Sequence, residues 1–247
     1  MLEARDLTAS FDGHILFERL TLTVAPGERV QIAAPSGAGK TTLCRLLAGY
    51  AEPQGGQVLV DGAPLPRHGT CPVQLIGQHP ERALDPRLRM EASLDEARGS
   101  RLGRAGRAPL RRGAEAPGDE ARLLDGATMA DDEARLLEEL GIRRQWLTRY
   151  PRELSGGELQ RFCIARALLA RPRYLIADEV STMLDAVTQA RIWSVLLAEA
   201  ERRNMGLVFV SHSPALAARI ATRVVELRVP PAPSVDSSWT NACQTGR

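Results

Sequence analysis

Runs of apolar residues, interrupted by Gly, Pro and Asp, divide the chain into predicted strands and helices. Apolar or alternating runs bounded by turn residues predict strands at 2–11, 15–24, 29–34, 57–62, 72–78, 174–179, 206–212 and 224–228. Helical spacing predicts helices at 41–48, 131–140, 187–200 and through 161–170. Strands that alternate with helices are typical of α/β proteins. The strand 206–212 is apolar on both faces, so we expect it at the centre of a sheet.

A glycine-rich turn, Ala34-Pro-Ser-Gly-Ala-Gly-Lys-Thr41, joins the third strand to the first helix. This order of strand, turn, Lys-Thr and helix is the phosphate-binding loop arrangement. Lys40 supplies a charge for the β- and γ-phosphates, and Thr41 supplies a hydroxyl for Mg²⁺. Ala34 replaces the first glycine of the pattern, which is tolerated if its φ is negative. The backbone N–H groups that would surround a phosphate belong to Ser36, Gly37, Ala38 and Gly39.

Four polar residues come at the ends of predicted strands, namely Gln78, Asp178, Glu179 and His212. Ligands of open α/β sheets collect at the carboxyl ends of strands, so we expect these side chains on one edge. Asp178 is a candidate for the Mg²⁺ hydration shell, Glu179 for the base that polarises the attacking water, and His212 for a γ-phosphate sensor. The alternative is a strand that ends in acidic residues beside a histidine without function.

The segment Leu154-Ser-Gly-Gly-Glu-Leu-Gln160 opens a helix. Ser155 and Glu158 have the spacing of a capping box. Gly156 and Gly157 leave the helix N-terminus sterically open, which suits a second phosphate contact. A simple helix cap would explain Ser155 and Glu158 but not the paired glycines.

Phe11 precedes the Asp12-Gly13 turn, and Asp185 lies in the loop before the helix 187–200. An aromatic side chain at position 11 could stack on a nucleotide base. It could equally be a core residue of an edge strand, and the sequence leaves both interpretations open.

Composition limits the classes of function. The 247 residues include 32 Lys and Arg and 30 Asp and Glu, and the net charge of +2 gives no reason to expect nucleic-acid binding. No apolar run approaches the roughly 20 residues that cross a bilayer, and the N-terminus lacks the apolar core of a signal peptide. The four cysteines form no C-x-x-C pair, which fits a reduced, cytosolic protein. Any membrane role is therefore expected to come through a partner.

Two segments are expected to lack a packed fold. Between about 99 and 129 the chain is rich in Gly, Ala, Arg and Pro, with a basic run followed by an acidic one. Such charge runs are usually mobile and solvated, and the alternative here is contact with a partner protein or with lipid head groups. Residues 229–247 are expected to be a disordered tail.

In this order the motifs resemble the nucleotide-binding subunit of ATP-binding cassette (ABC) transporters, over about residues 1–228. The most specific part is 154–160, which looks like the family signature sequence. The resemblance implies an α/β phosphate-loop core of the ABC ATPase type, with an antiparallel β subdomain at the N-terminus and a helical subdomain inserted at about 80–165. It also implies that the chain binds and hydrolyses ATP with Mg²⁺.

The resemblance also implies a role for each candidate residue. Phe11 would stack on adenine, Gln78 would sense the γ-phosphate and Mg²⁺, Glu179 would be the catalytic base, and His212 would be the switch histidine. The residues expected to take part in catalysis are Glu179, His212, Lys40 and Gln78. The residues expected at the metal are Thr41, Gln78 and Asp178. The residues expected to contact the nucleotide are Phe11, Ser36, Gly37, Ala38, Gly39, Lys40, Thr41, Thr42, Ser155, Gly156, Gly157 and Asp185.

The family likeness implies partners as well. The signature of one subunit would complete the ATP site of another, so a head-to-tail dimer with an identical or related cassette is expected. Closure of this dimer would drive transmembrane permease subunits at the cytoplasmic face of a bacterial inner membrane, supplied by a solute-binding protein. The segments 78–87 and 175–190 look most like the dipeptide/oligopeptide/nickel importer group, although Ala34, Val180 and Met183 depart from its usual residues.

Two other functions remain as alternatives. A non-transport ABC ATPase would regulate or assemble an enzyme complex, and such proteins often carry two cassettes, whereas one is present here. A phosphate-loop kinase of small molecules would need an acceptor-binding lid and would lack the signature, so the segment 154–160 argues against it.

Overall fold

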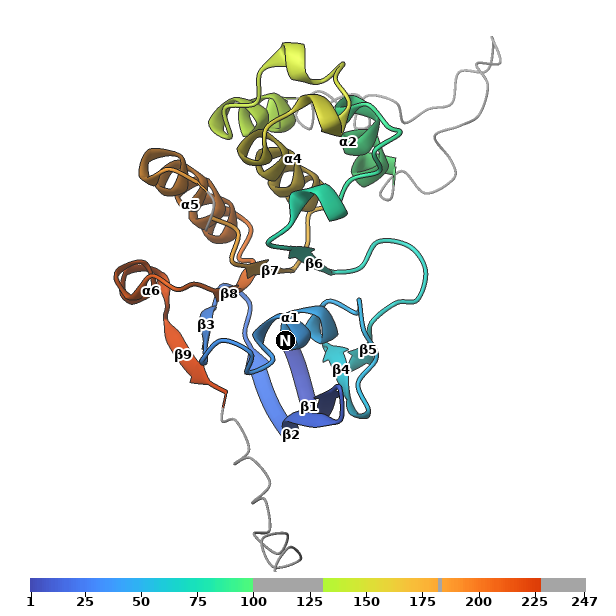
Figure 1. The fold of residues 1–247 in the computed structure, drawn as a ribbon, viewed down its shortest axis with the longest axis vertical. Coiled ribbons are helices and arrows are strands. Elements are labelled where there is room, and N and C mark those ends of the chain that lie inside the picture. Colours follow the sequence, from blue (N-terminus) through green and yellow to red (C-terminus); the bar gives the residue numbers. More distant parts are fainter. Residues whose placement is uncertain (100–130, 182–183, 228–247) are drawn as a thin grey trace, which may run out of the picture.

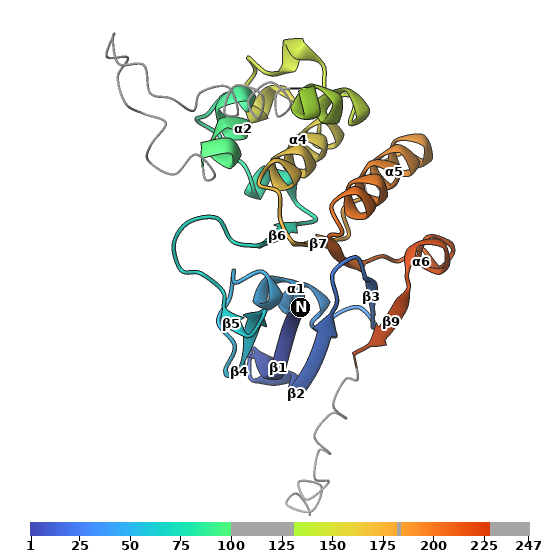
Figure 2. The same cartoon turned by 180° about the vertical axis from the view of Figure 1, so that it is seen from behind.

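The structure, a computed structural model, describes residues 1–99, 131–181 and 184–227. Three predictions therefore fall on residues outside the described ones. They concern the segment expected to be solvated, of which only residue 99 is described, Met183, and the expected tail 229–247. The described elements form two groups, which Figures 1 and 2 show from opposite sides. One group contains the sheets and the N-terminus, and the other is made of helices at the far end of the molecule.

Four antiparallel strands form the first sheet, in the order β2-β1-β4-β5. Their bounds are β1 Leu2–Phe11, β2 His14–Val24, β4 Gly55–Val60 and β5 Ala63–Pro64. β1 pairs with β2 from Leu2↔Val24 to Phe11↔His14, so the Asp12-Gly13 turn closes a hairpin as predicted. The small antiparallel sheet expected at the N-terminus is therefore present.

Five parallel strands form the second sheet, in the order β6-β7-β8-β3-β9. Their bounds are β3 Arg29–Ala33, β6 Val73–Ile76, β7 Tyr174–Asp178, β8 Gly206–Val210 and β9 Arg223–Glu226. β8 is the third of the five strands, which confirms its predicted central place. β7 and β8 pair in register from Tyr174↔Gly206 to Asp178↔Val210, so their carboxyl ends are level.

Helices surround the parallel sheet and form the far end of the molecule. Their bounds are α1 Lys40–Leu47, α2 Met90–Gly99, a helix at 131–139, α4 Gly156–Leu169, α5 Ala186–Arg202 and α6 Pro214–Ile220. Three short 3₁₀ turns are η1 Pro80–Arg82, η3 Arg144–Trp146 and η4 Pro151–Glu153. α2, α4 and the helix 131–139 gather away from the antiparallel sheet, whereas α1 lies against it (Figures 1 and 2). Among the described residues, no helix has both the length and the apolarity needed to cross a membrane.

Alternate residues of the two central strands face different hydrophobic cores. Leu175 and Phe209 belong to the core shared with α4 and α5. Ile176 and Val208 belong to the core shared with α1 and the antiparallel sheet. All four side chains have no exposed surface, and each contributes about 1.5–3 kcal/mol by leaving water. Burial on both faces explains why these strands show no alternation of apolar and polar residues.

The predicted boundaries agree with the observed ones to within a few residues. α6, β5 and the 3₁₀ turns were not predicted, and α2 lies in the stretch from about 91 onward where helical spacing begins. α6 spans only seven residues, too few for a helical period to be recognised. Its start does have a cap, because the Ser213 hydroxyl accepts a hydrogen bond from Leu216 N at 3.3 Å. β5 is a two-residue strand that includes Pro64, a residue that disfavours a strand prediction.

Candidate functional site

The phosphate-binding loop spans the gap between β3 and α1. β3 ends at Ala33 and α1 begins at Lys40, one residue earlier than predicted. Gly37 and Gly39 have φ of 80° and 88°, a left-handed conformation that only glycine adopts without strain. A Cβ at Gly39 would also lie 3.0 Å from Leu16 Cβ. Ala34 is not among the described residues with positive φ, so the methyl in place of the first glycine is accommodated.

The Lys40 side chain folds back along the loop. Its Nζ donates hydrogen bonds to the carbonyl oxygens of Ala34 and Pro35, each at 2.9 Å. The side chain is only 8% exposed, and it forms no ion pair with any carboxylate in the described part of the chain. A buried ammonium group that is hydrogen-bonded to neutral carbonyl oxygens is poised to attract an anion to the loop.

Asp178 ends β7 behind this loop and is 3% exposed. Burial raises the pKa of its carboxyl group, and a hydrogen bond with the Thr41 side chain opposes that effect. Asp178 Oδ1 is buried without any hydrogen-bond partner. Thr41, Gln78 and Asp178 are among the residues that line a cavity of about 610 Å³. A carboxylate, a hydroxyl and an amide around one space are oxygen donors of the kind that Mg²⁺ prefers, and the unpartnered oxygen fits such an ion.

Glu179 and His212 meet at the ends of β7 and β8. His212 Nε2 lies 2.7 Å from Glu179 Oε1. The Glu179 side chain is 13% exposed, whereas that of His212 is 54% exposed. Glu179 has φ of 53°, a strained conformation for a residue with a side chain, and its N–H donates to Val210 O at 3.3 Å. The strained turn thus directs the carboxylate toward the histidine of the next strand.

The predicted edge of polar residues is therefore present. Asp178 is the last residue of β7 and Glu179 follows it. His212 follows the adjacent strand β8, and Gln78 follows β6 on the other side of β7. They were grouped from sequence only because each ended an apolar run. The parallel order of the strands brings them together with the phosphate-binding loop.

Ser155 is the N-cap of α4, and its hydroxyl accepts a hydrogen bond from Glu158 N at 3.4 Å. The Glu158 carboxylate accepts one from Ser155 N at 2.8 Å, which confirms the capping box. A Cβ at Gly156 would meet no atom within 4 Å, and one at Gly157 would lie 3.0 Å from Leu184 Cδ2. The N-terminus of α4 is thus open at Gly156. A phosphate contact there stays a prediction, since α4 and α1 lie in different groups of elements (Figure 1).

Phe11 and Asp185 have different surroundings. The Phe11 side chain is 71% exposed at the end of β1, so the alternative that it is a core residue is wrong and its ring is available for stacking.

Asp185 caps α5, because its Oδ1 accepts hydrogen bonds from Val187 N at 3.1 Å and Thr188 N at 3.0 Å. Hydrogen bonds from Thr188 hold the pKa of Asp185 below its ordinary value. The cap gives Asp185 a local role beside the predicted nucleotide contact.

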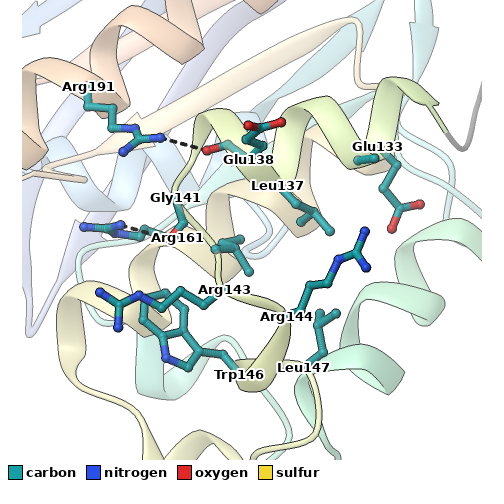
Figure 3. A pocket seen from close by; sticks show the side chains of 12 residues that line it. Glu133, Leu137, Glu138, Gly141, Arg143, Arg144, Trp146, Leu147, Arg161 and Arg191 are labelled. Atoms are coloured by element: carbon teal, nitrogen blue, oxygen red, sulfur yellow. Dashed lines mark hydrogen bonds between the residues drawn. The ribbon is translucent and has the colours of Figure 1, made fainter.

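Another cavity, of about 960 Å³, lies among the helices and contains none of the predicted site residues. Figure 3 shows Arg161 of α4 and Arg191 of α5 reaching the end of the helix 131–139. Arg161 donates to Gly141 O at 3.3 Å, and Arg191 donates to Glu138 O at 2.8 Å. Cations that bind the last carbonyl groups of a helix stabilise its C-terminus. These arginines fasten the helix 131–139 to α4 and α5.

One buried polar residue near the site was not given a role from sequence. Gln160 of α4 is 4% exposed, and its Nε2 lies 3.4 Å from the carbonyl oxygen of Gly77, the residue before Gln78. Its position as the last residue of the 154–160 motif was the only available signal, because the contact joins positions far apart in the sequence.

Comparison with known sequences agrees with this site. The family model described as "ABC transporter" matches residues 17–182. Over 214 residues the chain is 34% identical to the glutathione import ATP-binding protein GsiA of Escherichia coli O6:H1, which covers 84% of this chain and 31% of GsiA. Over 230 residues it is 30% identical to the nickel import system ATP-binding protein NikE of Staphylococcus aureus, which covers 92% of this chain and 87% of NikE. The chain therefore spans about a third of the length of GsiA and most of the length of NikE.

Solved structures agree on the fold. The structure of an ATP binding subunit of an ABC transporter matches with a TM-score of 0.73 and 24% identity, covering 92% of this chain and 86% of that one. A dimeric post-hydrolysis state of an ATP-binding cassette bound to ADP and Pi matches with a TM-score of 0.69 and 24% identity, covering 92% and 94%. These matches confirm the predicted fold class, an α/β phosphate-loop core of the ABC ATPase type.

Proposed function

Because this chain belongs to the ABC transporter family, we propose that it is the ATP-hydrolysing subunit of an importer. The proposal rests on one observation. The phosphate-binding loop, the orphaned carboxylate oxygen of Asp178 and the Glu179–His212 pair are gathered at the carboxyl ends of neighbouring parallel strands. The relatives named as import ATP-binding proteins support import over regulation or assembly of an enzyme complex.

ATP binds at the loop through the N–H groups of Ser36 to Thr42 and the ammonium group of Lys40. Phe11, exposed at the end of the β1–β2 hairpin, stacks on the base. Thr41, Gln78 and Asp178 hold Mg²⁺ in the cavity that they line. The metal, when bound, neutralises charge on the phosphates and so makes the terminal phosphoryl group easier to attack.

Glu179 and His212 act on the attacking water. Glu179 accepts a proton from the water as general base. His212 holds the Glu179 carboxylate through the 2.7 Å contact, which keeps the base in one orientation. Lys40 stabilises the negative charge that develops on the phosphate oxygens. Together these residues accelerate hydrolysis only when the terminal phosphate is in place.

The working unit is a head-to-tail dimer with a second cassette. Ser155 and Gly156, exposed at the N-terminus of α4, and Gly157 beside them contact the nucleotide held by the partner, and Asp185 lies at the same interface. For the domain boundaries we propose a cassette at 1–228 that contains a helical subdomain at about 80–165.

The cassette acts with membrane proteins that differ from it. Permease subunits receive its motion at the cytoplasmic face of the inner membrane, and a solute-binding protein delivers the cargo. The names of GsiA and NikE suggest small peptides such as glutathione, or nickel, as the transported solutes.

The test begins with phosphate release by the purified chain in MgATP, with dimerisation followed by light scattering. Wild type should turn over, and Glu179→Gln should bind ATP, accumulate as a dimer and lose turnover. A wild-type chain without MgATP hydrolysis would refute the enzymatic part. Import is tested separately by uptake of radiolabelled nickel and glutathione in cells with and without the gene. If uptake of nickel and uptake of glutathione were each the same in cells with and without the gene, the assigned cargo would be refuted.

A further inference from the structure

Three side chains of α4 bind the segment that follows β6 in a constant register. Gln160 Nε2 lies 3.4 Å from Gly77 O, Cys163 Sγ 3.7 Å from Pro80 O, and Arg166 Nη1 2.8 Å from Ala83 O. Each donor lies 83 residues after its acceptor. Donors three residues apart on a helix lie near one face, so the segment 77–83 runs along α4 as a ladder of side chain to main chain contacts.

The first contact of this ladder lies beside the candidate site. Gly77 is bonded covalently to Gln78, which lines the cavity with Thr41 and Asp178. Gln160 belongs to the 154–160 motif at the start of α4. Its side chain is 4% exposed, and its Oε1 is buried without a partner. A buried amide that leaves one oxygen unsatisfied costs stability, so packing alone does not favour glutamine over an apolar residue here.

The ladder also fixes the course of the main chain between β6 and η1. β6 ends at Ile76, one residue before the first contact, and η1 begins at the second contact. The main chain at Gly77 and Gln78 therefore runs from the end of β6 in the parallel sheet to a contact with α4, two elements that Figures 1 and 2 show next to each other. A shift of α4 relative to the sheet must displace Gly77, and with it Gln78.

We propose that Gln160 is a positioning residue that fixes Gln78 relative to the signature loop 154–160. The inference rests on the proposed function, because it gives Gln78 its part in ATP hydrolysis. The signature loop and Gln160 belong to one rigid helix start, so the position of the loop is passed to Gln78 through the Gly77 carbonyl. Hydrolysis then depends on where α4 lies, while nucleotide binding at Lys40 does not.

The test uses Gln160→Met, which keeps the length of the side chain but removes the donor. Turnover should fall about fivefold to tenfold, the effect of losing one such hydrogen bond, and half-maximal turnover should require more Mg²⁺. ATP affinity and the urea midpoint should stay unchanged. In a Gln78→Ala background, the added Gln160→Met change should lower turnover less than about twofold, because coupled residues are not additive. Ser93→Ala is the matched control, since it removes another buried, unpartnered polar atom, on α2.

Two outcomes would overturn the proposal: normal turnover in Gln160→Met, or an equal loss with and without Gln78. Both outcomes require a wild-type chain that hydrolyses ATP. A wild-type chain without hydrolysis would instead contradict the proposed function, so the two failures can be told apart. If Gln160→Met does not fold, Gln160→Leu takes its place, because it also removes the donor to Gly77 O. Gln160→Leu should lower turnover when Gln78 is present and by less than about twofold in the Gln78→Ala background, and an equal loss in both backgrounds would overturn the proposal.

Discussion

His212 Nε2 lies 2.7 Å from Glu179 Oε1, and the two residues follow the neighbouring parallel strands β7 and β8. The contact joins the proposed base to a residue that is far more exposed than the base itself. His212 is therefore the member of the pair that solvent reaches, and the Glu179 carboxylate is the shielded one.

This relationship predicts different effects of the two substitutions. Glu179→Gln should lower phosphate release by at least about 100-fold, the usual contribution of a general base, with ATP still bound. His212→Ala should lower it less, by about tenfold, because the base remains but is free to turn. Steady-state phosphate release and binding of a fluorescent ATP analogue measure the two effects. Glu201→Gln on the exposed face of α5 is the control, and an equal loss in His212→Ala and Glu179→Gln would contradict the assigned roles.

Removing the Lys40 ammonium group should weaken MgATP binding and not only slow hydrolysis. Lys40→Met should weaken MgATP binding by about 10- to 100-fold, since hydrogen bonds to charged groups contribute about 1.5–3 kcal/mol each. Isothermal titration with a slowly hydrolysed ATP analogue measures the affinity. Arg219→Met, which removes an exposed cation on α6, should leave it unchanged. Unaltered affinity in Lys40→Met would mean that the loop binds phosphate through its N–H groups alone.

The sequence predicted most of this site because its signals are local. The glycines at 37 and 39, the Lys40-Thr41 pair and the two acids at the end of β7 each lie within a few residues of the strand that presents them. The central place of β8 could also be predicted, since a strand buried on both faces must be apolar throughout. These features depend on neighbours along the chain.

Contacts between distant segments could not be predicted in the same way. The Gln160–Gly77 contact spans 83 residues, and no local pattern marks its two ends as partners. Glu199 is similar, because a glutamate within a helix is ordinarily exposed. Its complete burial depends on arginines supplied by α5 and by the helix 131–139. Likewise, the cavity that Thr41, Gln78 and Asp178 help to line exists only after strands β6 and β7 have paired.

If Phe11 stacks on adenine, its removal should weaken binding only of ligands that carry a nucleotide base. Phe11→Ala should weaken ATP binding at least about fivefold, because base–aromatic stacking contributes about 1–3 kcal/mol. Binding of inorganic tripolyphosphate, which has no base, should not change, and Phe11→Trp should retain ATP affinity. The side chain is 71% exposed, so the urea midpoint should be unaffected. If Phe11→Ala weakened tripolyphosphate binding as well, Phe11 would be stabilising the β1–β2 hairpin and not stacking on the base of ATP.

Ala34 predicts a small effect on function. Its φ is not positive, so its methyl group adds no strain, and restoring the glycine of the common pattern should change ATP affinity by less than about threefold. Ala34→Gly should instead lower the free energy of unfolding by about 0.4–1 kcal/mol, because glycine gives the unfolded chain more freedom. Urea unfolding and nucleotide titration measure both quantities. A tenfold gain in affinity would show that the methyl group obstructs the phosphate.

Glu199 predicts a pH-dependent part of the stability. Burial alone would raise the pKa of this carboxyl group, but hydrogen bonds from Arg202 and Arg135, at 2.7 and 2.9 Å, outweigh burial and hold the pKa below its ordinary value of 4.5. A carboxylate with a lowered folded-state pKa stabilises the fold above its unfolded pKa, and this contribution is lost as the pH falls through the folded value.

Glu199→Gln should therefore lower the free energy of unfolding by about 3 kcal/mol at pH 7, the usual cost of breaking a buried ion pair. The difference from wild type should stay constant down to about pH 5 and shrink below it, as wild-type Glu199 becomes protonated. Urea unfolding at several pH values measures both curves. Glu201→Gln, on the exposed face of the same helix, should follow wild type throughout. A difference that grew as the pH fell would mean that Glu199 is held protonated. Its neighbours Arg135, Arg202 and Arg203 would then repel one another instead of binding a carboxylate.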